Sequence, residues 1–395
     1  MLVPFLKYCH LSNPYLLPTK MYYNMKGHCS LAATEHSLAV TGLKLKLMNN
    51  PDFVEQILEI PITPRFLTIA YIALVLKHTR HWFLSTQRSL YGHFKIRWHV
   101  NIGIPSPGYN DKCLIELYKR IVTDAWKLSV EEGSITFKKV AEIAQSPKQK
   151  SIDLDIDLND INVIPEILAE VVGYAKSNLR ETGLHVLIDI GASTLDISGF
   201  ILHDHEGEDR YSFLTSDLDT LGAFFCHQER VKSVKEYLYR WFTHLSTRAD
   251  LVLPISPTLA DYFPKLADFG QEGEKEINEI FYKKCWALIN RTLMSLKKHR
   301  DPNSERFEHG LPIFVCGGGK NLEIYKHVLD DLNEFWKNSM RTNGFIPRNL
   351  PVPENFIADS IDVKEFDRFA VAYGLSFPHY NIGGITPPGE IPDIL

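Results

Sequence analysis

Residues 185–202, HVLIDIGASTLDISGFIL, predict two β-strands joined by a turn of very small side chains. The apolar run that starts at Val186 ends at Asp189, and apolar residues resume at Leu195 with the alternation of a strand. A turn of small residues, here 191–194, lets backbone N–H groups approach an anion without obstruction. The stretch therefore predicts a nucleotide-phosphate site, and an ordinary tight hairpin with solvated aspartates is the alternative.

The polar side chains of this stretch suit the same chemistry. The turn itself is Gly191, Ala192, Ser193 and Thr194, and the hydroxyl of Thr194 lies beside the backbone donors. Asp189 and Asp196 flank the turn with carboxylates that could hold a hydrated divalent cation.

A second turn of small residues follows another apolar segment. Residues 311–316, LPIFVC, predict a buried strand that leads directly into Gly317, Gly318 and Gly319, and a helix is expected over 322–336. A strand, a glycine turn and a helix form a place where a ligand can approach the backbone. A tight strand-to-helix turn packed against a neighbour is the alternative.

Other segments are predicted from periodicity. A helix over 163–177 leads into the central hairpin, a long helix is expected over 221–245, and another over 364–375. The acidic run 151–160 is predicted to be a strand. A calcium loop does not fit there, because apolar residues stand where that loop needs glycine and glutamate.

The composition is that of a globular protein without an obvious charged or membrane partner. The chain has 395 residues, enough for two domains, with 45% hydrophobic and 23% charged residues and a net charge of −5. No basic excess indicates nucleic-acid binding. The longest apolar run, 66–76, is too short to span a bilayer, so no membrane partner is expected. Six scattered cysteines without a C-x-x-C pair favour reduced thiols and a cytoplasmic protein.

Taken in order, four motifs resemble the actin-like ATPase superfamily, which includes actin, DnaK-type heat-shock chaperones, sugar kinases and plasmid-segregation filaments. DIGASTLDISGF at 189–200 resembles its second phosphate loop, and FVCGGGKNLEIY at 314–325 its adenosine loop. IPEILAEVVGYA at 164–175 and RFAVAYGLSF at 368–377 are similar to its two connecting helices. With the elements between them, the resemblance extends over roughly residues 95 to 377.

The resemblance implies an α/β fold of two lobes, each a ribonuclease-H-like β-meander with helices, with ATP held in a cleft between them. Lobe I would comprise residues 1–182, completed by 362–395, and lobe II residues 183–361 with the second phosphate loop and the adenosine loop. The implied cofactors are ATP and Mg²⁺.

The resemblance also implies residue roles. Asp189 would hold Mg²⁺ through water, and Glu166 would help to position the attacking water or the metal. Lys44 would approach the terminal phosphate. The phosphate oxygens would lie on Gly191, Ala192, Ser193 and Thr194, and the adenosine on Gly317, Gly318 and Gly319. No covalent nucleophile is required, because positioning a water and neutralising phosphate charge can supply the catalysis.

The sequence also departs from the family pattern. The family has a first phosphate hairpin, D-x-G-T/S, near its N-terminus, but here no aspartate precedes Asp52 and no glycine precedes Gly27. Either the chain as given begins downstream of its true start, or half of the phosphate clamp is lost, and hydrolysis is expected to be slow or absent. Arg368 and Asn321 replace an acid and an arginine of the DnaK-type chaperones, which argues against that identity.

Three functions remain open from the sequence. The first is a DnaK-like or actin-like switch in which ATP closes the cleft for a protein partner. The second is a filament-forming segregation protein, which would self-associate, and the third is a non-catalytic binding module that retains the fold. A sugar kinase is less favoured, because no carboxylate outside the phosphate motifs is evident as a base.

Overall fold

The computed structural model describes residues 2–8, 13–54, 61–105, 108–109, 111–145, 156–237, 271–356 and 362–391. Within these ranges the chain is a mixed α/β protein, which confirms the predicted class. Two compact units are present: unit 1 contains residues 1–102, 113–163 and 358–360, and unit 2 contains 103–112, 164–357 and 361–395. The lobe boundaries at 182 and 362 were inferred from the order of the motifs in the sequence, and they stay a prediction.

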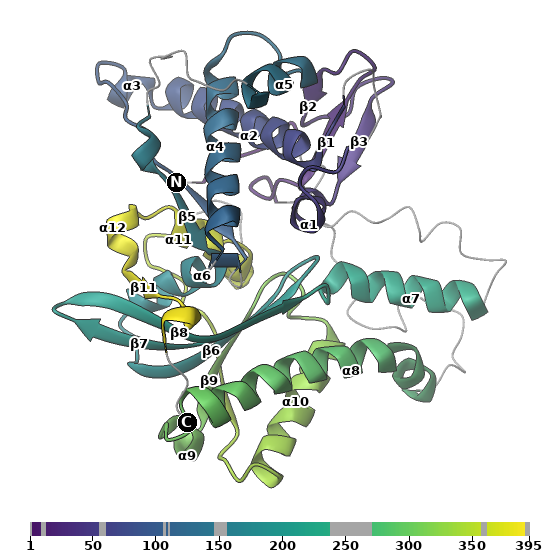
Figure 1. Ribbon diagram of the computed structural model, residues 1–395, viewed down its shortest axis with the longest axis vertical. Coiled ribbons are helices and arrows are strands. Elements are labelled where there is room, and N and C mark those ends of the chain that lie inside the picture. The colour runs from purple at the N-terminus through teal and green to yellow at the C-terminus, as the bar shows by residue number, and fades with distance from the viewer. Residues whose placement is uncertain are drawn as a thin grey trace. The chain divides into compact units, whose positions relative to one another are not determined.

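Unit 1 combines a small antiparallel sheet with helices (Figure 1). The sheet has the order β2-β1-β3, and Met21, within β1, and Leu43 are both buried. The elements are β1 (Lys20–Tyr23), β2 (Cys29–Ser30), β3 (Leu38–Thr41), α1 (Leu43–Asn49), α2 (Pro64–Thr86), α3 (Arg88–Tyr91), α4 (Lys112–Val130) and α5 (Phe137–Gln145). Strands β4 (Val100–Ile104) and β5 (Ile161–Pro165) form a separate two-stranded sheet.

Helix α2 begins where the sequence provides a cap. The hydroxyl of Thr63 accepts a hydrogen bond from the Phe66 amide, and Pro64 occupies the first turn, where its missing N–H costs nothing. The first half of the helix buries Ile69, Ala70 and related residues, whereas its last turn is largely exposed.

Unit 2 is built on a six-stranded mixed sheet of order β10-β9-β6-β7-β8-β11. Its strands are β6 (Gly183–Ile190), β7 (Leu195–His205), β8 (Glu208–Asp219), β9 (Leu311–Cys316), β10 (Phe345–Arg348) and β11 (Gly384–Thr386). Strands β6, β7 and β8 form an antiparallel meander. Strand β9 runs parallel to β6, with Asp189 opposite Cys316, so both strands end at the same edge of the sheet.

Helices cover both faces of this sheet (Figure 1). Alternate residues of β6 face opposite ways: Val186 and Ile188 pack with α8 (Gln271–Ser295) and α10 (Glu323–Asn338). Leu187 packs on the other side with α6 (Glu166–Ala175) and α11 (Ala370–Leu375). The remaining helical segments are α7 (Ala223–Tyr237), α9 (Arg306–His309) and α12 (His379–Ile382), a π-helical turn at Leu296–Arg300, and 3-10 turns at Leu158–Asp160, Val363–Arg368 and Pro388–Glu390.

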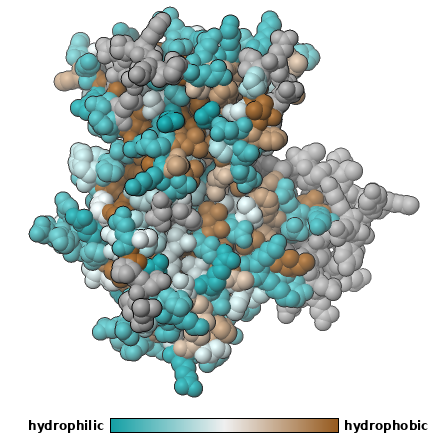
Figure 2. All heavy atoms as spheres, in the orientation of Figure 1, coloured by the Kyte–Doolittle hydropathy of each residue, from teal (hydrophilic) through white to brown (hydrophobic). Residues whose placement is uncertain are grey.

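Figure 2 shows hydrophilic side chains over much of the visible face, with apolar ones in small groups. Within the described ranges, every helix is too short or too polar to span a bilayer.

The predicted central hairpin is confirmed as β6 and β7. Three other predictions need correction. The helix expected over 163–177 begins at Glu166, because residues up to Pro165 pair as strand β5. Within 151–160, residues 158–160 form a 3-10 turn and not a strand, and 151–155 lie outside the described residues. In the helix expected over 364–375, only Ala370–Leu375 is α-helical. The helix expected over 221–245 is described only as far as Tyr237.

Candidate functional site

The candidate site begins with the turn between β6 and β7. The amide of Gly191 donates to the carbonyl of Thr194 at 2.9 Å, which closes the turn. Residues 191–193 are half-buried, and both strands that flank them are in the core. The turn is thus a rigid, partly exposed loop at the edge of a buried sheet.

The start of α7 occupies the carbonyl side of this turn. The amides of Gly222, Ala223 and Phe224 donate to the carbonyls of residues 193, 191 and 192 at 3.2, 3.0 and 2.7 Å. These bonds fix the orientation of the peptide units in the turn. They also use the amides at the N-terminus of α7, which therefore serve the turn and not a ligand.

The amide side of the turn is different. Among the residues that the structure describes, the N–H groups of Ala192, Ser193 and Thr194 have no hydrogen-bond acceptor. Because residues 191–193 are half-buried, these donors can reach solvent or a ligand. Successive backbone N–H groups of this kind can form a concavity that binds an anion such as phosphate.

The glycine turn after β9 lies directly against this site. The amide of Gly319 donates to the carbonyl of Ile190 at 2.9 Å. Gly317 has φ +83°, and a Cβ at this position would overlap the Asp189 carboxylate and the Ile190 carbonyl. The structure therefore places the two turns side by side at one edge of the sheet, with Asp189 between them. Ligands of open α/β sheets bind at this type of edge, beyond the carboxyl ends of strands.

The Thr194 hydroxyl is oriented by a buried acid. Its Oγ1 donates to Asp196 Oδ2 at 3.1 Å, and both residues are buried. Because the hydroxyl proton points at Asp196, the Thr194 oxygen presents only lone pairs to any ligand. Thr194 is therefore suited to accept from water or to face a cation, and its backbone amide remains the donor for an anion.

Acidic groups surround Asp189 beneath the turn. Glu170 of α6 is buried, and its Oε2 has no hydrogen-bond partner within the described part of the chain. Burial raises the pKa of Glu170 well above its ordinary value, and the negative charges of Asp189, Glu166, Asp196 and Asp367 add to this effect. Burial, together with the negative potential of Glu170, Asp189 and Asp367, also raises the pKa of the Cys316 thiol.

Two cations stand on the other side of the glycine turn. Lys320 forms an ion pair with the buried carboxylate of Asp367. Arg368 lies beside Gly318, and partial burial lowers its pKa, with Glu365 opposing that effect. The edge of the sheet therefore carries acidic side chains near the turn 191–194 and basic side chains next to the glycine turn 317–319.

The other sequence-predicted residues divide between the units. Glu166, the first residue of α6, packs against Gly103 in unit 2, and its charge acts on Glu170. Lys44 belongs to α1 of unit 1, so it is not among the residues that the sheet of unit 2 assembles. Its approach to a phosphate stays a prediction.

Sequence reasoning missed Glu170 and Asp367. A signal for Glu170 was present, because it is a single acid within LAEVVGYA, an otherwise apolar helical stretch. A charged residue at a fully buried position is rare unless it serves a site or has a partner. The role of Asp367 depends on Lys320, 47 residues earlier, and no local pattern marks that pair.

A divalent cation fits this site only together with a ligand. In the described ranges no group of three or more His, Cys, Asp or Glu side chains is arranged to hold a metal ion. Mg²⁺, however, commonly keeps several waters and binds through one or two carboxylates plus substrate phosphates. The single carboxylate of Asp189 beside the turn meets that requirement.

Unit 1 also has a hairpin turn, between β1 and β2, in which three successive amides are occupied. The side chain of Asn24 accepts from the amides of Lys26 and His28 at 3.0 and 3.1 Å. The Gly27 amide donates to the Asn24 carbonyl at 2.8 Å. This turn therefore has no spare donors at the three positions where the other turn has them.

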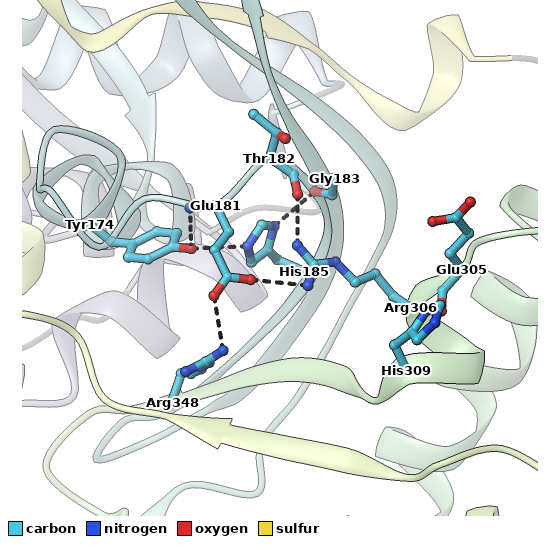
Figure 3. Close-up of polar contacts among 9 residues, drawn as sticks. All are labelled: Tyr174, Glu181, Thr182, Gly183, His185, Glu305, Arg306, His309 and Arg348. Carbon is cyan, nitrogen blue, oxygen red and sulfur yellow. Dashed lines mark hydrogen bonds and ion pairs between the residues drawn. The ribbon is translucent and has the colours of Figure 1, made fainter.

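A second polar cluster of unit 2 is equally saturated. His185, at the start of β6, is buried; its Nδ1 donates to the Gly183 carbonyl at 2.8 Å, and its Nε2 accepts from the Tyr174 hydroxyl at 3.2 Å (Figure 3). Glu181 bridges Arg306 and Arg348 at 3.0 and 2.9 Å. Burial lowers the pKa of His185 to about 4. This cluster fixes the start of the strand and leaves no group for a ligand.

No family model and no curated protein matches the sequence. Among solved structures, MreB5 of Spiroplasma citri bound to AMPPNP is 14% identical with a TM-score of 0.46, over 91% of this chain and 87% of that chain. The same protein bound to ADP is 13% identical with a TM-score of 0.41, over 90% and 87%. MreB5 is an actin-like ATPase, the superfamily that the order of the four motifs resembles. At this identity and TM-score the likeness carries no functional argument.

Proposed function

We propose that this protein binds Mg-ATP at the edge of the unit 2 sheet and uses it as a conformational switch. The phosphate chain would lie on the amides of Ala192, Ser193 and Thr194, and the adenosine against Gly317, Gly318 and Gly319. The observation that carries the proposal is the run of three acceptor-free amides with the glycine turn immediately beside it. An ordinary tight hairpin would instead satisfy these donors internally, as the turn of unit 1 does.

The charges around the turn explain why a cation would be needed. Asp189, Asp196 and Glu166 carry negative charge close to the position proposed for the phosphates. Bound Mg²⁺ would neutralise phosphate charge. In this arrangement Asp189 would hold the hydrated cation, and Asp196 would keep the Thr194 hydroxyl turned so that its lone pairs face the ligand.

Hydrolysis is proposed to be slow. Catalysis of phosphoryl transfer depends on donors and charges placed around the transferred group. In the turn Asn24–His28 of unit 1 the amides of Lys26, Gly27 and His28 are bonded internally, so this turn offers no run of successive free donors to a phosphate. Glu166 would position the attacking water, in keeping with its place at the start of α6 near the acids of the site.

The test combines binding and stability. Because a ligand that binds only the folded protein must stabilise it, Mg-ATP should raise the melting temperature, whereas Mg²⁺ alone should not. Titration calorimetry should show that Asp189→Ala lowers the affinity for Mg-ATP by roughly 10- to 100-fold. Thr194→Ala should lower it less, because the backbone donor remains.

Asp204→Ala is the matched control. Asp204 lies at the far end of β7 and is exposed, so its removal should leave nucleotide affinity unchanged. Equal Mg-ATP affinity in the wild type, Asp189→Ala and Thr194→Ala would remove the site assignment. Phosphate release at a rate typical of kinases, roughly 1 per second or faster, would contradict slow hydrolysis.

A further inference from the structure

Glu170 of α6 is a buried acid that the described part of the fold does not fully pair. Its side chain is 2% exposed, and its neighbours in the helix, Ala169 and Val171, belong to the apolar core. Its Oε2 has no hydrogen-bond partner among the described residues. Burying a carboxyl oxygen without a partner costs free energy of folding, so such a group usually marks a place where a ligand uses it.

Glu170 lies on the same side of the sheet as the acids at the end of the central hairpin. Leu187 of β6 packs with α6, and Asp189, two residues further along the strand, faces the same way. Asp196 of β7 is directly opposite Asp189, so it lies on this face as well. Helix α6 therefore covers the face on which both aspartates lie, next to the turn 191–194.

The charges around Glu170 are negative. The strongest electrostatic effects on it come, in decreasing order, from Asp189, Glu166, Asp196 and Asp367. Glu166 stands one helical turn before Glu170, on the same face of α6. Lys320, the cation next to the glycine turn, is paired with Asp367. Among the described residues, Glu170 therefore lies in a negative potential that a bound cation would relieve.

A purely structural role fits Glu170 less well. Asp160 of unit 1 is also buried, and it shows how an acid that serves the fold is held. One of its carboxylate oxygens contacts Arg97 at 2.9 Å, and the other contacts His99 at 3.2 Å. Glu170 is more deeply buried than Asp160, yet its Oε2 lacks any such contact in the described ranges.

We propose that Glu170 is a second carboxylate of the cation site and holds Mg²⁺ together with Asp189 when nucleotide binds. Mg²⁺ at phosphate sites is bound through one or two carboxylates, several waters and the phosphates of the substrate. Two protein carboxylates are within that number, and they are fewer than the three side chains that a site without nucleotide would need. This inference rests on the proposed function, because phosphate oxygens would complete the coordination.

The test is the cation dependence with which the full chain binds a non-hydrolysable ATP analogue. Titration calorimetry with Mg²⁺, and again with EDTA in place of Mg²⁺, gives the factor by which the cation strengthens binding. Glu170→Gln should reduce this factor roughly 10- to 100-fold, and the affinity measured in EDTA should not fall. Because the analogue is not hydrolysed, this readout is independent of turnover.

A second variant and a matched control accompany this measurement. Glu170→Met keeps a side chain of similar length without an oxygen atom, and it should reduce the cation effect as Glu170→Gln does. Glu334→Gln makes the same change of charge at an exposed position of α10, so Mg²⁺ should strengthen binding there as in the wild type. Neither Glu170 variant should lower the melting temperature of the nucleotide-free protein, because the lost oxygen has no partner to leave behind.

The outcomes separate this inference from the nucleotide site itself. An undiminished cation effect in both Glu170 variants would overturn the inference and leave the nucleotide site in place. A clear fall in the melting temperature of both nucleotide-free variants would show that Glu170 serves the fold, and it would overturn the inference as well. Absence of binding by the wild type, with and without Mg²⁺, would remove the proposed function and this inference with it.

Discussion

Each unit has a hairpin turn between two antiparallel strands, but the two turns differ in whether their backbone amides have hydrogen-bond acceptors. In the turn Asn24–His28, the amides of Lys26, Gly27 and His28 all bond to Asn24. In the turn 191–194, three successive amides have no acceptor among the described residues. The difference arises because an asparagine side chain can fold back on its own turn, whereas glycine, alanine and serine here do not.

The comparison teaches where to look for a ligand. A turn whose donors are internally satisfied gains stability and offers nothing to a partner. A turn held from behind, as α7 holds the carbonyls of 191–193, can keep its donors unsatisfied at no loss of rigidity. The saturated cluster around His185 belongs with the first kind, although it lies on the same strand as Asp189.

The largest expected effect is a loss of stability when Gly317, which packs against Asp189 and Ile190, is replaced. Gly317→Ala should lower the free energy of unfolding by roughly 4 kcal/mol, because a left-handed backbone strains alanine and its Cβ would collide with Asp189 and Ile190. Chemical denaturation measures the loss.

Gly207→Ala is its control. Gly207 has the same φ, +83°, but nothing lies within 4 Å of an added Cβ, so this variant should lose only about 1 kcal/mol. Equal losses in the two variants would show that Gly317 does not pack against the candidate site.

The next effect tests the saturated cluster. His185 is neutral in the folded protein, because burial lowers its pKa from 6.5 to about 4. As pH falls through this interval the unfolded chain takes up a proton and the folded chain does not. The contribution of His185 to the free energy of unfolding is therefore fully present above pH 6.5, and about 3 kcal/mol of it should be lost by pH 4. Urea titrations across this range measure the slope.

The corresponding controls separate His185 from other titrating groups. His185→Phe should flatten the pH dependence by that amount, and His205→Asn, at the exposed end of β7, should leave it unchanged. Neither substitution should alter Mg-ATP affinity near neutral pH. An unchanged slope in His185→Phe would contradict the assignment.

The smallest effect tests the occupied turn directly. Asn24→Ala removes two hydrogen bonds from exposed amides, which water can replace, so stability should fall by about 1 kcal/mol. Asn50→Ala, which removes a single such bond, should cost less. Mg-ATP affinity should not change in either variant, and a tenfold loss in Asn24→Ala would show that the unit 1 turn takes part in binding.

Much of the candidate site could be predicted from the sequence, because each of its two turns is formed by one short segment of the chain. The apolar run before 191–194 and the alternation after it predicted the hairpin, and the apolar run before Gly317 predicted the strand and its turn. The pairing of Asp189 with Cys316, which brings the two turns together, is a contact between segments more than a hundred residues apart. Sequence reasoning reached it only through the resemblance of motif order.

Other features could not be read locally. Pro165 is compatible with the first turn of a helix, yet pairing of β5 with β4 makes it the end of a strand. The bonds from α7 to the turn, and the short strand β11 beside β8, also depend on tertiary contacts. Glu170 could have been found, since its burial contradicts its charge.

The central claim is that the amides of Ala192, Ser193 and Thr194 bind phosphate, and backbone NMR of the isotope-labelled chain tests it most directly. Addition of Mg²⁺ with a non-hydrolysable ATP analogue should shift these three amide resonances and leave those of Lys26, Gly27 and His28 in place. Saturable nucleotide binding with the resonances of residues 192–194 unmoved would contradict the account.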